Sequence, residues 1–358
     1  MELLSVTMND GVMPRSEIEG KDNSSEDKSN YKVVLTGDMV YNSMRMWQGA
    51  NGISPCDGIV SPAYTVLMPK IPISNGYFAA FFKSPNLINE FRKNSQGMTS
   101  DTWNLKYPQI ETIKVCIPAL SEQNRVADML RTLERRIAKQ AQLVDNLKKY
   151  KRGVMQRIFR QLPSQNGAEW ACVRLGDIFK KVSRRNADGV IKNVITNSAE
   201  YGLIPQRDFF DKDIAVDGNT ANYYVIENGD FVYNPRKSNS APCGPFNRYT
   251  LSEQGIISPL YTCLVLQADI SPSYLAWYFK SDAWYRYIYD NGSQGVRHDR
   301  VSMTDDLLMG IPVMYPSHEK QLLYADILDV VEARLQATQK TLDLLSKTRN
   351  GYMKQLFI

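Results

Sequence analysis

Two stretches of the chain, one reaching residue 158 and one reaching residue 356, place apolar residues alternately three and four positions apart. This spacing puts one apolar stripe along one face of a long helix, as in helices that pack lengthwise on each other. The first stripe consists of Leu130, Leu133, Ile137, Val144, Leu147, Val154 and Ile158. The second consists of Leu328, Val331, Leu335, Leu342, Leu345, Tyr352 and Leu356. The pattern predicts two long helices packed on each other.

The two stretches align without a gap at an offset of 198 residues, so the chain contains a repeat. Each stripe is interrupted by polar residues at the same two positions, Gln140 and Lys151 in the first copy and Thr338 and Arg349 in the second. An unrelated pair of surface helices is the alternative. The agreement in both stripe and interruptions favours two helices that contact each other.

Serines stand where each long helix is expected to begin. Ser121 and Ser317 are suitable N-caps because a serine hydroxyl accepts a hydrogen bond from the first turn. A helix over residues 122–159 is roughly 55 Å long at about 1.5 Å per residue. This length suits a spacer or a platform for partners rather than the core of a small domain.

Upstream of each long helix, the same short blocks recur in the same order. Residues 37–42, 58–65, 77–84 and 95–97 correspond to residues 229–234, 255–262, 274–281 and 293–295. The first two blocks mix Gly, Pro, β-branched and aromatic residues, which predicts short strands joined by turns. The aromatic block at 77–84 predicts a short buried helix. The chain is therefore a tandem repeat of one domain followed by one long helix.

Composition adds few constraints. The 358 residues are 43% hydrophobic and 23% charged, which is enough for two domains with cores. No apolar run of about 18 residues and no amino-terminal signal pattern is present, so we expect a cytoplasmic protein. Five cysteines without a CxxC spacing argue against disulfides and structural zinc and are expected to be buried thiols. The net charge of +5 is compatible with a polyanionic partner but is weak support.

Catalytic motifs are missing. The sequence has no phosphate-binding GxxxxGK[ST] loop and no HExxH metal motif. Asn234-Pro235-Arg236 resembles only the beginning of the Asn-Pro-Pro-aromatic element of amino-methyltransferases. Glu26-x-Lys28 matches the tail of a nuclease carboxylate motif, but such spacings arise often by chance in polar loops. We expect no catalysis in this chain.

Groups suited to DNA recognition gather after the repeated strands. Arginine and lysine suit phosphates and guanine, and asparagine and glutamine suit adenine. The candidates are Arg15, Asn42, Arg45, Gln48, Gln96, Thr99 and Ser100 in the first copy and Arg207, Arg236, Lys237, Asn239, Gln294, Arg297, His298 and Arg300 in the second. Ordinary solvated loops are an equal alternative for each residue. A shared frame with divergent polar loops fits two readers of different half-sites.

The first long helix is rich in basic residues. They are Arg131, Arg135, Arg136, Lys139, Lys148, Lys149, Lys151, Arg152, Arg157 and Arg160. Such a surface suits phosphate binding without sequence selectivity. The commoner explanation of a charged run is a solvated helix face.

Together these features resemble the specificity subunit of type I restriction-modification systems, over essentially the whole chain. The resemblance rests on the duplicated Pro-x-x-x-x-Gln start of each long helix at 118–123 and 316–321, the helix ends at 151–156 and 349–354, and the domain opening at 170–177. It implies an α+β fold with two target-recognition domains, separated by two long antiparallel coiled-coil helices in a pseudo-two-fold repeat. The implied segments are a domain at 1–120, a helix at 121–160, a linker at 161–169, a domain at 170–316 and a helix at 317–358.

The resemblance also implies a division of labour. Each domain reads one half of a split double-stranded DNA site in the major groove, and the helix pair sets the gap between the halves. The stripe residues from Leu130 to Leu147 and from Leu328 to Leu345 form the helix–helix or partner interface. Methyltransferase subunits dock on the helices and a restriction and translocation subunit joins them. S-adenosylmethionine, ATP and Mg belong to those partners, and this chain is expected to hold no cofactor or metal.

The two copies differ at their beginnings. The second copy has about 22 residues, from Trp170 to Ile191, that the first copy lacks, so the first domain has either a truncated or a naturally short start. Two other functions stay open at this point. One is the specificity subunit of a related bifunctional methyltransferase-nuclease system, which differs only in its partner. The other is a coiled-coil scaffold whose domains bind proteins rather than DNA.

Overall fold

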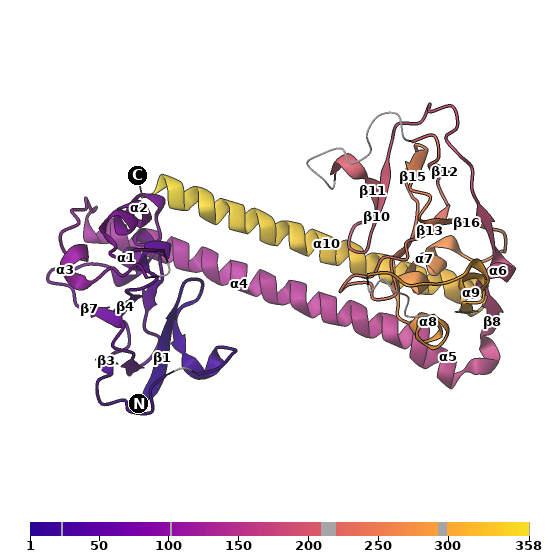
Figure 1. The fold of residues 1–358 in the computed structure, drawn as a ribbon. Coiled ribbons are helices and arrows are strands. Elements are labelled where there is room, and N and C mark those ends of the chain that lie inside the picture. The colour runs from indigo at the N-terminus through magenta and orange to yellow at the C-terminus, as the bar shows by residue number, and fades with distance from the viewer. Residues whose placement is uncertain (23, 101, 209–219, 293–298, 358) are drawn as a thin grey trace. The chain divides into compact units, whose positions relative to one another are not determined.

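The computed structural model describes residues 1–358 except 23, 101, 209–219, 293–298 and 358. It divides into two compact units, Met1–Val144 with Ala337–Ile358, and Asp145–Gln336. The long helices α4 (Leu120–Gln156) and α10 (His318–Gln355) each contribute one part to each unit (Figure 1). The predicted α+β class and the two long helices are confirmed.

The first unit contains two sheets. One has the strand order β2 (Gly11–Pro14), β1 (Glu2–Thr7), β6 (Gly58–Val60) and β3 (Lys32–Val34). The other has the order β5 (Asn51–Ile53), β4 (Met39–Asn42) and β7 (Tyr64–Leu67). Neighbouring strands are antiparallel except β1 and β6, which are parallel. The remaining elements are η1 (Arg15–Glu17), η2 (Met46–Gln48), α1 (Asn75–Phe81), α2 (Pro85–Asn94) and α3 (Tyr107–Ile110).

Strand β4 separates two cores because successive side chains of a strand point to opposite faces. Val40 packs with Leu4 and Val60 from the other sheet. Tyr41, the next residue, packs with Tyr77 and Phe91 from the helices α1 and α2. Both Val40 and Tyr41 are fully buried, so β4 is held from both faces.

In its described residues, the second unit contains more strands than the first, and the paired strands there are antiparallel. The largest sheet has the order β14 (Phe246–Arg248), β13 (Phe231–Tyr233), β16 (Thr262–Leu266) and β9 (Phe179–Val182). Three pairs accompany it, namely β10 (Ile195–Ser198) with β11 (Gly202–Pro205), β12 (Tyr224–Ile226) with β15 (Gly255–Ile257), and β8 (Ala171–Arg174) with β17 (Pro312–Tyr315). Its short helices are α5 (Leu162–Gln165), α6 (Leu175–Ile178), α7 (Pro272–Lys280), α8 (Tyr285–Asn291) and α9 (Asp305–Met309), with the short turns η3 (Arg157–Gln161), η4 (Gly167–Glu169) and η5 (Gln206–Asp208).

The repeated Gly-Asp pair before β4 and β13 has the same structural role in both copies. Gly37 and Gly229 have φ of 92° and 99°, a left-handed conformation that favours glycine. The carboxylate of Asp38 accepts a hydrogen bond from the Leu35 N–H at 2.9 Å, and Asp230 accepts one in the same way from a backbone N–H. The pair therefore forms the tight turn that starts each strand, as the repeat predicted.

Residues 170–182, which only the second copy has, form part of its sheets. They supply β8, α6 and β9, and β9 pairs with β16 along the edge of the largest sheet. Among the described residues of the first unit, the counterpart of β16 is β7, which pairs only with β4. In the described residues, the sheet built on β13 and β16 therefore has one more strand than the sheet built on β4 and β7.

A buried glutamine joins each long helix to its domain. Gln123 accepts a hydrogen bond from the Ser74 N–H at 3.0 Å and donates one to the Pro118 carbonyl at 2.9 Å. Gln321 makes the same two bonds with Ser271 and Pro316, at 2.8 and 2.9 Å. Both glutamines are 2% exposed. Since Ser74 and Ser271 are the N-caps of α1 and α7, one amide links the short helix, the preceding turn and the long helix.

The predicted short buried helix at 77–84 is confirmed as α1, and its counterpart as α7. The prediction that Ser121 is the N-cap of the first long helix is wrong. The helix α4 begins at Leu120, and the Ala119 carbonyl accepts hydrogen bonds from Glu122 and Gln123 at 3.0 Å each. The Gln123 amide bonds to the turn before the helix, so the first turn closes without a serine cap. Ser317 directly precedes α10, and its carbonyl accepts from the Gln321 N–H.

The apolar stripes are buried to different degrees. Leu130, Leu133, Val144, Leu328 and Val331 are buried, while Ile137, Leu147, Leu335, Leu342 and Leu345 are partly buried. In the first unit the interruptions at Gln140 and Thr338 meet, because the Gln140 amide donates to the Thr338 carbonyl at 3.0 Å. In the second unit the interruption at Lys151 forms an ion pair with Glu332 at 2.7 Å. The polar breaks at Gln140, Thr338 and Lys151 therefore contact polar groups of the other long helix.

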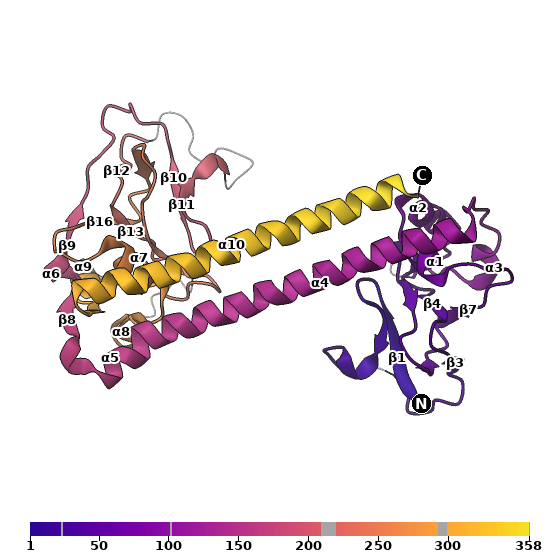
Figure 2. The same cartoon turned by 180° about the vertical axis from the view of Figure 1, so that it is seen from behind.

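The predicted stripe fails at the carboxyl end of the second long helix. Tyr352 and Leu356 are 39% and 36% exposed, whereas Phe357 is 4% exposed. The Phe357 ring stacks on Phe81 at 5.3 Å and meets Tyr77 edge-on at 5.3 Å. The inward face shifts by one residue because Phe357 packs on the rings of α1. The carboxyl end of α10 lies beside α2 in Figure 2, where the Phe357 carbonyl accepts a hydrogen bond from Asn86 at 3.2 Å.

The first long helix ends in the same manner within the second unit. Phe159, the counterpart of Phe357, packs against Tyr274 and Tyr278 of α7 at 5.5 and 5.8 Å. It lies in η3, a turn of π-helix that directly follows α4. Each long helix thus starts in the core of one unit and ends in the core of the other.

The expectation of buried thiols is only partly correct. Cys243 and Cys263 are buried, but Cys116 and Cys172 are exposed, and the cysteines are free. Within the described residues, no group of three or more His, Cys, Asp or Glu is placed to hold a metal ion. Among the helices that the structure describes, none is both long and apolar enough to span a membrane.

We expect Phe357→Ala to destabilise the first unit by about 3–5 kcal/mol, because a buried aromatic side chain leaves a cavity. Leu356→Ala is the matched control and should change stability little, since that side chain is more exposed. Urea unfolding followed by circular dichroism measures both. Equal shifts for the two variants would contradict the packing described for this helix end.

We expect Gln123→Ala to lower stability through two unpaired backbone groups, each costing about 1–3 kcal/mol when buried. Gln142→Ala, at an exposed position of the same helix, serves as control and should stay within about 0.5 kcal/mol of the unsubstituted chain. Thermal unfolding of the two variants provides the comparison. A Gln123 variant as stable as its control would show that the amide is not a structural link.

Candidate nucleic-acid interface

In the first unit, the two loops that carry the candidate residues are joined. The Leu105 N–H donates to the Ser43 carbonyl at 2.8 Å, which links the segment after β4 to the segment after Gly97. The rings of Trp47 and Trp103 meet edge-on at 5.1 Å across the same junction. Two loops that are distant in sequence therefore form one surface.

The candidate side chains of the first unit lie on this surface. Arg45 is exposed and Gln48 is half-buried in η2, while Gln96, Thr99 and Ser100 are exposed. The backbone of Gln96 pairs with that of Asn104, which closes the loop between them. A hydroxyl of Thr102 accepts from the Thr99 N–H at 3.1 Å. The loop is thus held by its own backbone and by the Thr102 hydroxyl, and Gln96, Thr99 and Ser100 stay exposed to solvent.

The second unit joins the equivalent loops by an equivalent bond. The Val301 N–H donates to the Pro235 carbonyl at 2.8 Å. Pro235 corresponds to Ser43 in the repeat, and Val301, like Leu105, follows the repeated Ser-Gln-Gly block by a few residues. A second bond, from the Lys237 N–H to the Asp299 carbonyl, also measures 2.8 Å. The two copies therefore share the loop junction, although the loop sequences differ.

One carboxylate aligns two arginines at the second junction. Asp299 lies 3.9 Å from the Nε of Arg236 and 3.8 Å from the Nε of Arg300. The Arg236 side chain is 65% exposed, so its guanidinium keeps free donors. Asn239 is exposed nearby in sequence, and Lys237 is half-buried.

Sequence analysis missed Asp299, Trp47 and Trp103. Two signals in the sequence point to them. Asp299 lies between basic neighbours, and Trp47 and Trp103 lie within polar loops. Three further candidates, Gln294, Arg297 and His298, lie outside the described residues.

The asparagine at the end of each repeated strand forms the following turn. Asn42 Oδ1 accepts from the Met44 N–H at 3.1 Å, and Asn234 Oδ1 accepts from the Arg236 N–H at 3.0 Å. Recognition of adenine by asparagine needs both the amide oxygen and the amide nitrogen. Asn42 therefore shapes its loop, and a contact of Asn42 with DNA stays a prediction.

The buried side-chain amides of three asparagines form a hydrogen-bond network beside the loop that carries Arg236. The Asn234 Nδ2 donates to the Asn197 carbonyl, and the Asn197 Nδ2 donates to the Val232 carbonyl at 2.9 Å. Asn247 donates to Asn197 Oδ1 at 2.8 Å. This network connects β13 with the hairpin β10–β11, which η5 and the exposed Arg207 follow.

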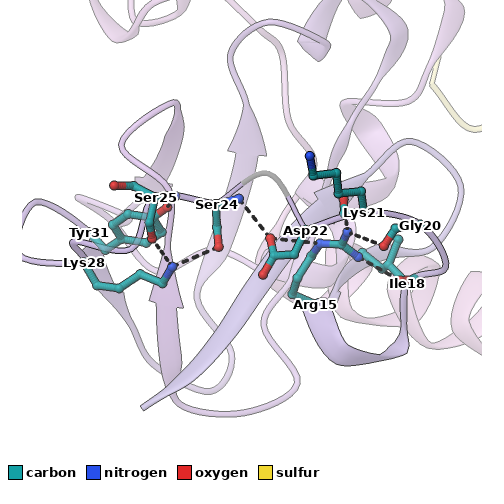
Figure 3. A network of polar contacts seen from close by, with 9 residues as sticks. All are labelled: Arg15, Ile18, Gly20, Lys21, Asp22, Ser24, Ser25, Lys28 and Tyr31. Carbon is teal, nitrogen blue, oxygen red and sulfur yellow. Dashed lines mark hydrogen bonds and ion pairs between the residues drawn. The ribbon is translucent and has the colours of Figure 1, made fainter.

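Arg15 folds into its own loop, as Figure 3 shows. Its guanidinium donates to the Ile18 carbonyl at 2.7 Å and to the Gly20 and Lys21 carbonyls at 3.1 and 2.7 Å. Its Nε lies 3.5 Å from the Asp22 carboxylate, and the side chain is 16% exposed. Arg15 therefore organises the loop, and a phosphate contact by Arg15 stays a prediction that requires this network to open.

Lys28, the lysine of the Glu26-x-Lys28 pattern, makes its contacts in the same loop. The Lys28 Nζ donates to the Ser24 hydroxyl at 2.9 Å and lies 5.1 Å from the centre of the Tyr31 ring (Figure 3). It also contacts the Ser25 carbonyl. The contacts of Lys28 are those of a loop-stabilising residue.

Some of the basic residues on the first long helix have acidic partners. Arg131 pairs with Asp128 at 2.7 Å within the same helix. Past the end of α4, Arg160 pairs with Asp282 at 3.1 Å. With Lys151 already paired to Glu332, these contacts fit the solvated-face explanation for part of the basic run.

Comparison with solved structures identifies the fold. The chain resembles the type I restriction-modification S subunit of M. genitalium with a TM-score of 0.57 and 14% identity, over 91% of this chain and 84% of that one. A chain from a structure on complex assembly and conformational transition of a type I restriction-modification system gives a TM-score of 0.53 and 18% identity, over 93% and 84%. No protein-family model and no curated protein sequence matches the chain. The chain therefore has the fold of type I specificity subunits.

We expect Trp103→Ala to loosen the loop junction of the first unit, because the aromatic pair contributes about 0.5–1.5 kcal/mol beyond its burial. The Leu105 amide should then exchange with solvent several-fold faster in hydrogen-exchange mass spectrometry. Tyr107→Ala is the control, since that ring is exposed and makes no ring contact across the junction. Unchanged exchange at Leu105 would mean that the backbone bond alone holds the loops.

Proposed function

We propose that this chain is the DNA-sequence-reading specificity subunit of a type I restriction-modification enzyme. The observation that carries the proposal is the loop junction, which both copies build with equivalent backbone bonds and equip with different side chains. A protein that reads two different half-sites needs one frame used twice with different recognition groups. The fold shared with type I S subunits supports the same conclusion.

Each junction presents groups suited to base edges. In the second unit, Arg236 and Arg300 are held side by side by Asp299, and arginine bonds guanine in a bidentate manner. In the first unit, Arg45 and Gln48 lie on the joined loops, and glutamine suits adenine. We propose that the two domains contact double-stranded DNA through these loops and prefer different bases.

The long helices are proposed to serve partners. Leu322, Leu323, Ile327 and Val330 are exposed apolar residues on α10, a surface that suits docking of methyltransferase subunits. A restriction and translocation subunit would join this complex, and S-adenosylmethionine, ATP and Mg would bind to those partners. In this proposal the helix pair acts as the ruler between the half-sites, and catalysis takes place outside this chain.

Two alternatives make different predictions. The specificity subunit of a bifunctional system would bind DNA in the same way, and a neighbouring gene for a separate translocase would argue against it. A protein-binding scaffold would not need matched recognition loops and would bind no specific DNA.

The test is methylation mapping in cells that express this chain with its methyltransferase subunit. We expect a bipartite target, and Arg236→Ala with Arg300→Ala should weaken recognition of one half-site only. Each lost bidentate contact costs about 1–3 kcal/mol, so methylation of that target should fall at least tenfold. Arg286→Ala, an arginine 92% exposed on α8 of the same unit, is the control and should leave methylation unchanged.

Arg45→Ala with Gln48→Ala should affect the other half-site. Unchanged methylation in both double variants would contradict the assignment of the loops. Assembly with the methyltransferase subunit but no sequence-specific methylation would favour the scaffold alternative.

A further inference from the structure

The first unit contains a cavity of about 830 Å³ bounded by the start of the domain, by α1 and by the long helices α4 and α10. This volume lies in the range of roughly 300–1,000 Å³ typical of binding pockets. Ala80, Lys83, Glu134 and Arg349 belong to its walls. Arg131 also lines it with a side chain that is 71% exposed, so the cavity opens to solvent there.

The repeat shows what occupies the equivalent place in the second unit. Ala80 corresponds to Trp277, whose indole is 5% exposed. The indole N–H donates to Asp329 at 2.8 Å. The Lys280 and Lys151 ammonium groups lie 4.7 and 5.6 Å from the centre of the ring. Trp277 therefore fills its site as an aromatic ring contacted by two cations.

The charged walls of that site are present in both copies. Lys83 and Glu134 correspond to Lys280 and Glu332, and Arg349 corresponds to Lys151. Burial lowers the pKa of Lys83, and the nearby Glu134 carboxylate opposes this effect. No described residue forms a hydrogen bond, an ion pair or a cation–π contact with the Lys83 ammonium. The first unit thus keeps the cations and lacks the ring.

We propose that this cavity binds an aromatic side chain of the methyltransferase subunit that docks on the long helices. The inference rests on the function proposed above, because it identifies where on this chain the methyltransferase subunit binds and which type of side chain it inserts there. A cation near the face of an aromatic ring attracts the ring, most strongly where water is excluded. Aromatic side chains inserted into pockets are also typical energetic centres of protein interfaces.

One difference between the copies indicates which ring fits. Arg131 stands where the second copy has Asp329, the acceptor of the indole N–H. Arginine donates and cannot accept hydrogen bonds, so the favoured ring carries an acceptor, as the tyrosine hydroxyl does. Arg131 already pairs with Asp128, but one pair leaves further N–H groups available.

The charges and size of the cavity favour a protein partner. Its walls carry four basic residues, Lys83, Arg131, Arg135 and Arg349, against three acidic residues, Asp10, Asp128 and Glu134. The excess of positive charge suits an aromatic residue with acidic neighbours. The volume exceeds that of a single ring, so it accommodates a short segment around the ring. Because α4 and α10 form walls of the cavity, a subunit lying along these helices in the first unit passes its opening.

The test fills the cavity with a larger side chain at Ala80, a residue of its wall. Ala80→Trp should place an indole against Lys83 and Arg349. The Trp277 indole lies against Lys280 and Lys151 in the same way in the second unit. In isothermal titration with the methyltransferase subunit encoded with this chain, we expect binding to weaken at least tenfold. Lys93→Trp, on an exposed position of α2, is the control and should bind as the unsubstituted chain does.

Two further measurements separate the outcomes. Ala80→Trp should unfold at a temperature no lower than the unsubstituted chain, and if it does not fold, Lys83→Met with Arg349→Met replaces it and should weaken binding likewise. Normal binding by these variants would overturn the inference and leave the proposed function standing. If the unsubstituted chain does not bind the methyltransferase subunit, the proposed function fails and this docking fails with it.

Binding of N-acetyl-tyrosinamide, followed by ligand-observed NMR, tests the cavity without the partner. We expect weak saturable binding to the unsubstituted chain that Ala80→Trp abolishes. Binding unaffected by Ala80→Trp, or no binding, would overturn the aromatic specificity of the cavity.

Discussion

The structure depends on the buried amide of Gln123 and its counterpart Gln321. Each amide satisfies a helix N-cap and a turn carbonyl in a place that excludes water, where unpaired polar groups are costly. It thereby sets how a domain meets the start of its long helix. Next to it, the stripe of the long helix, the short helix and the repeated strand share one core, as Leu130, Tyr77 and Tyr41 do in the first unit. Because both copies make the same bonds, the repeat preserves a physical joint as well as a sequence pattern.

Features governed by local pattern were predictable from the sequence. The long helices, the strands at 37–42 and 229–234 and the short buried helices follow from periodicity and turn residues, which act over a few positions. Features governed by tertiary contacts were not. The inward shift to Phe357 depends on where α1 lies, and the partial burial of Arg15 depends on carbonyls that its own loop presents. For the candidate interface, the sequence indicated the loops, but the junction and Asp299 needed the fold.

The two copies can be compared position by position, which shows the structural effect of each difference in sequence. Where both have the same residue, as at Gln123 and Gln321, the same two hydrogen bonds explain the agreement. Where they differ, as at Ala80 and Trp277, the same frame shows the consequence of the change. The additional strand β9 of the second unit is a difference of the same kind, since it covers an edge of β16. A frame that tolerates such changes is stabilised mainly by contacts that both copies retain.

The loop junction explains how the loop side chains can differ between the copies while the frame stays constant. The bonds from Leu105 to Ser43 and from Val301 to Pro235 join backbone to backbone, so they do not depend on side-chain identity. The turns before them need only the asparagine at the strand end. The side chains at the junction differ between the copies. One copy has a pair of tryptophans, and the other has an aspartate between two arginines. Side chains at the junction can therefore change with little effect on the core, which is the property that the proposed reading of two different half-sites requires.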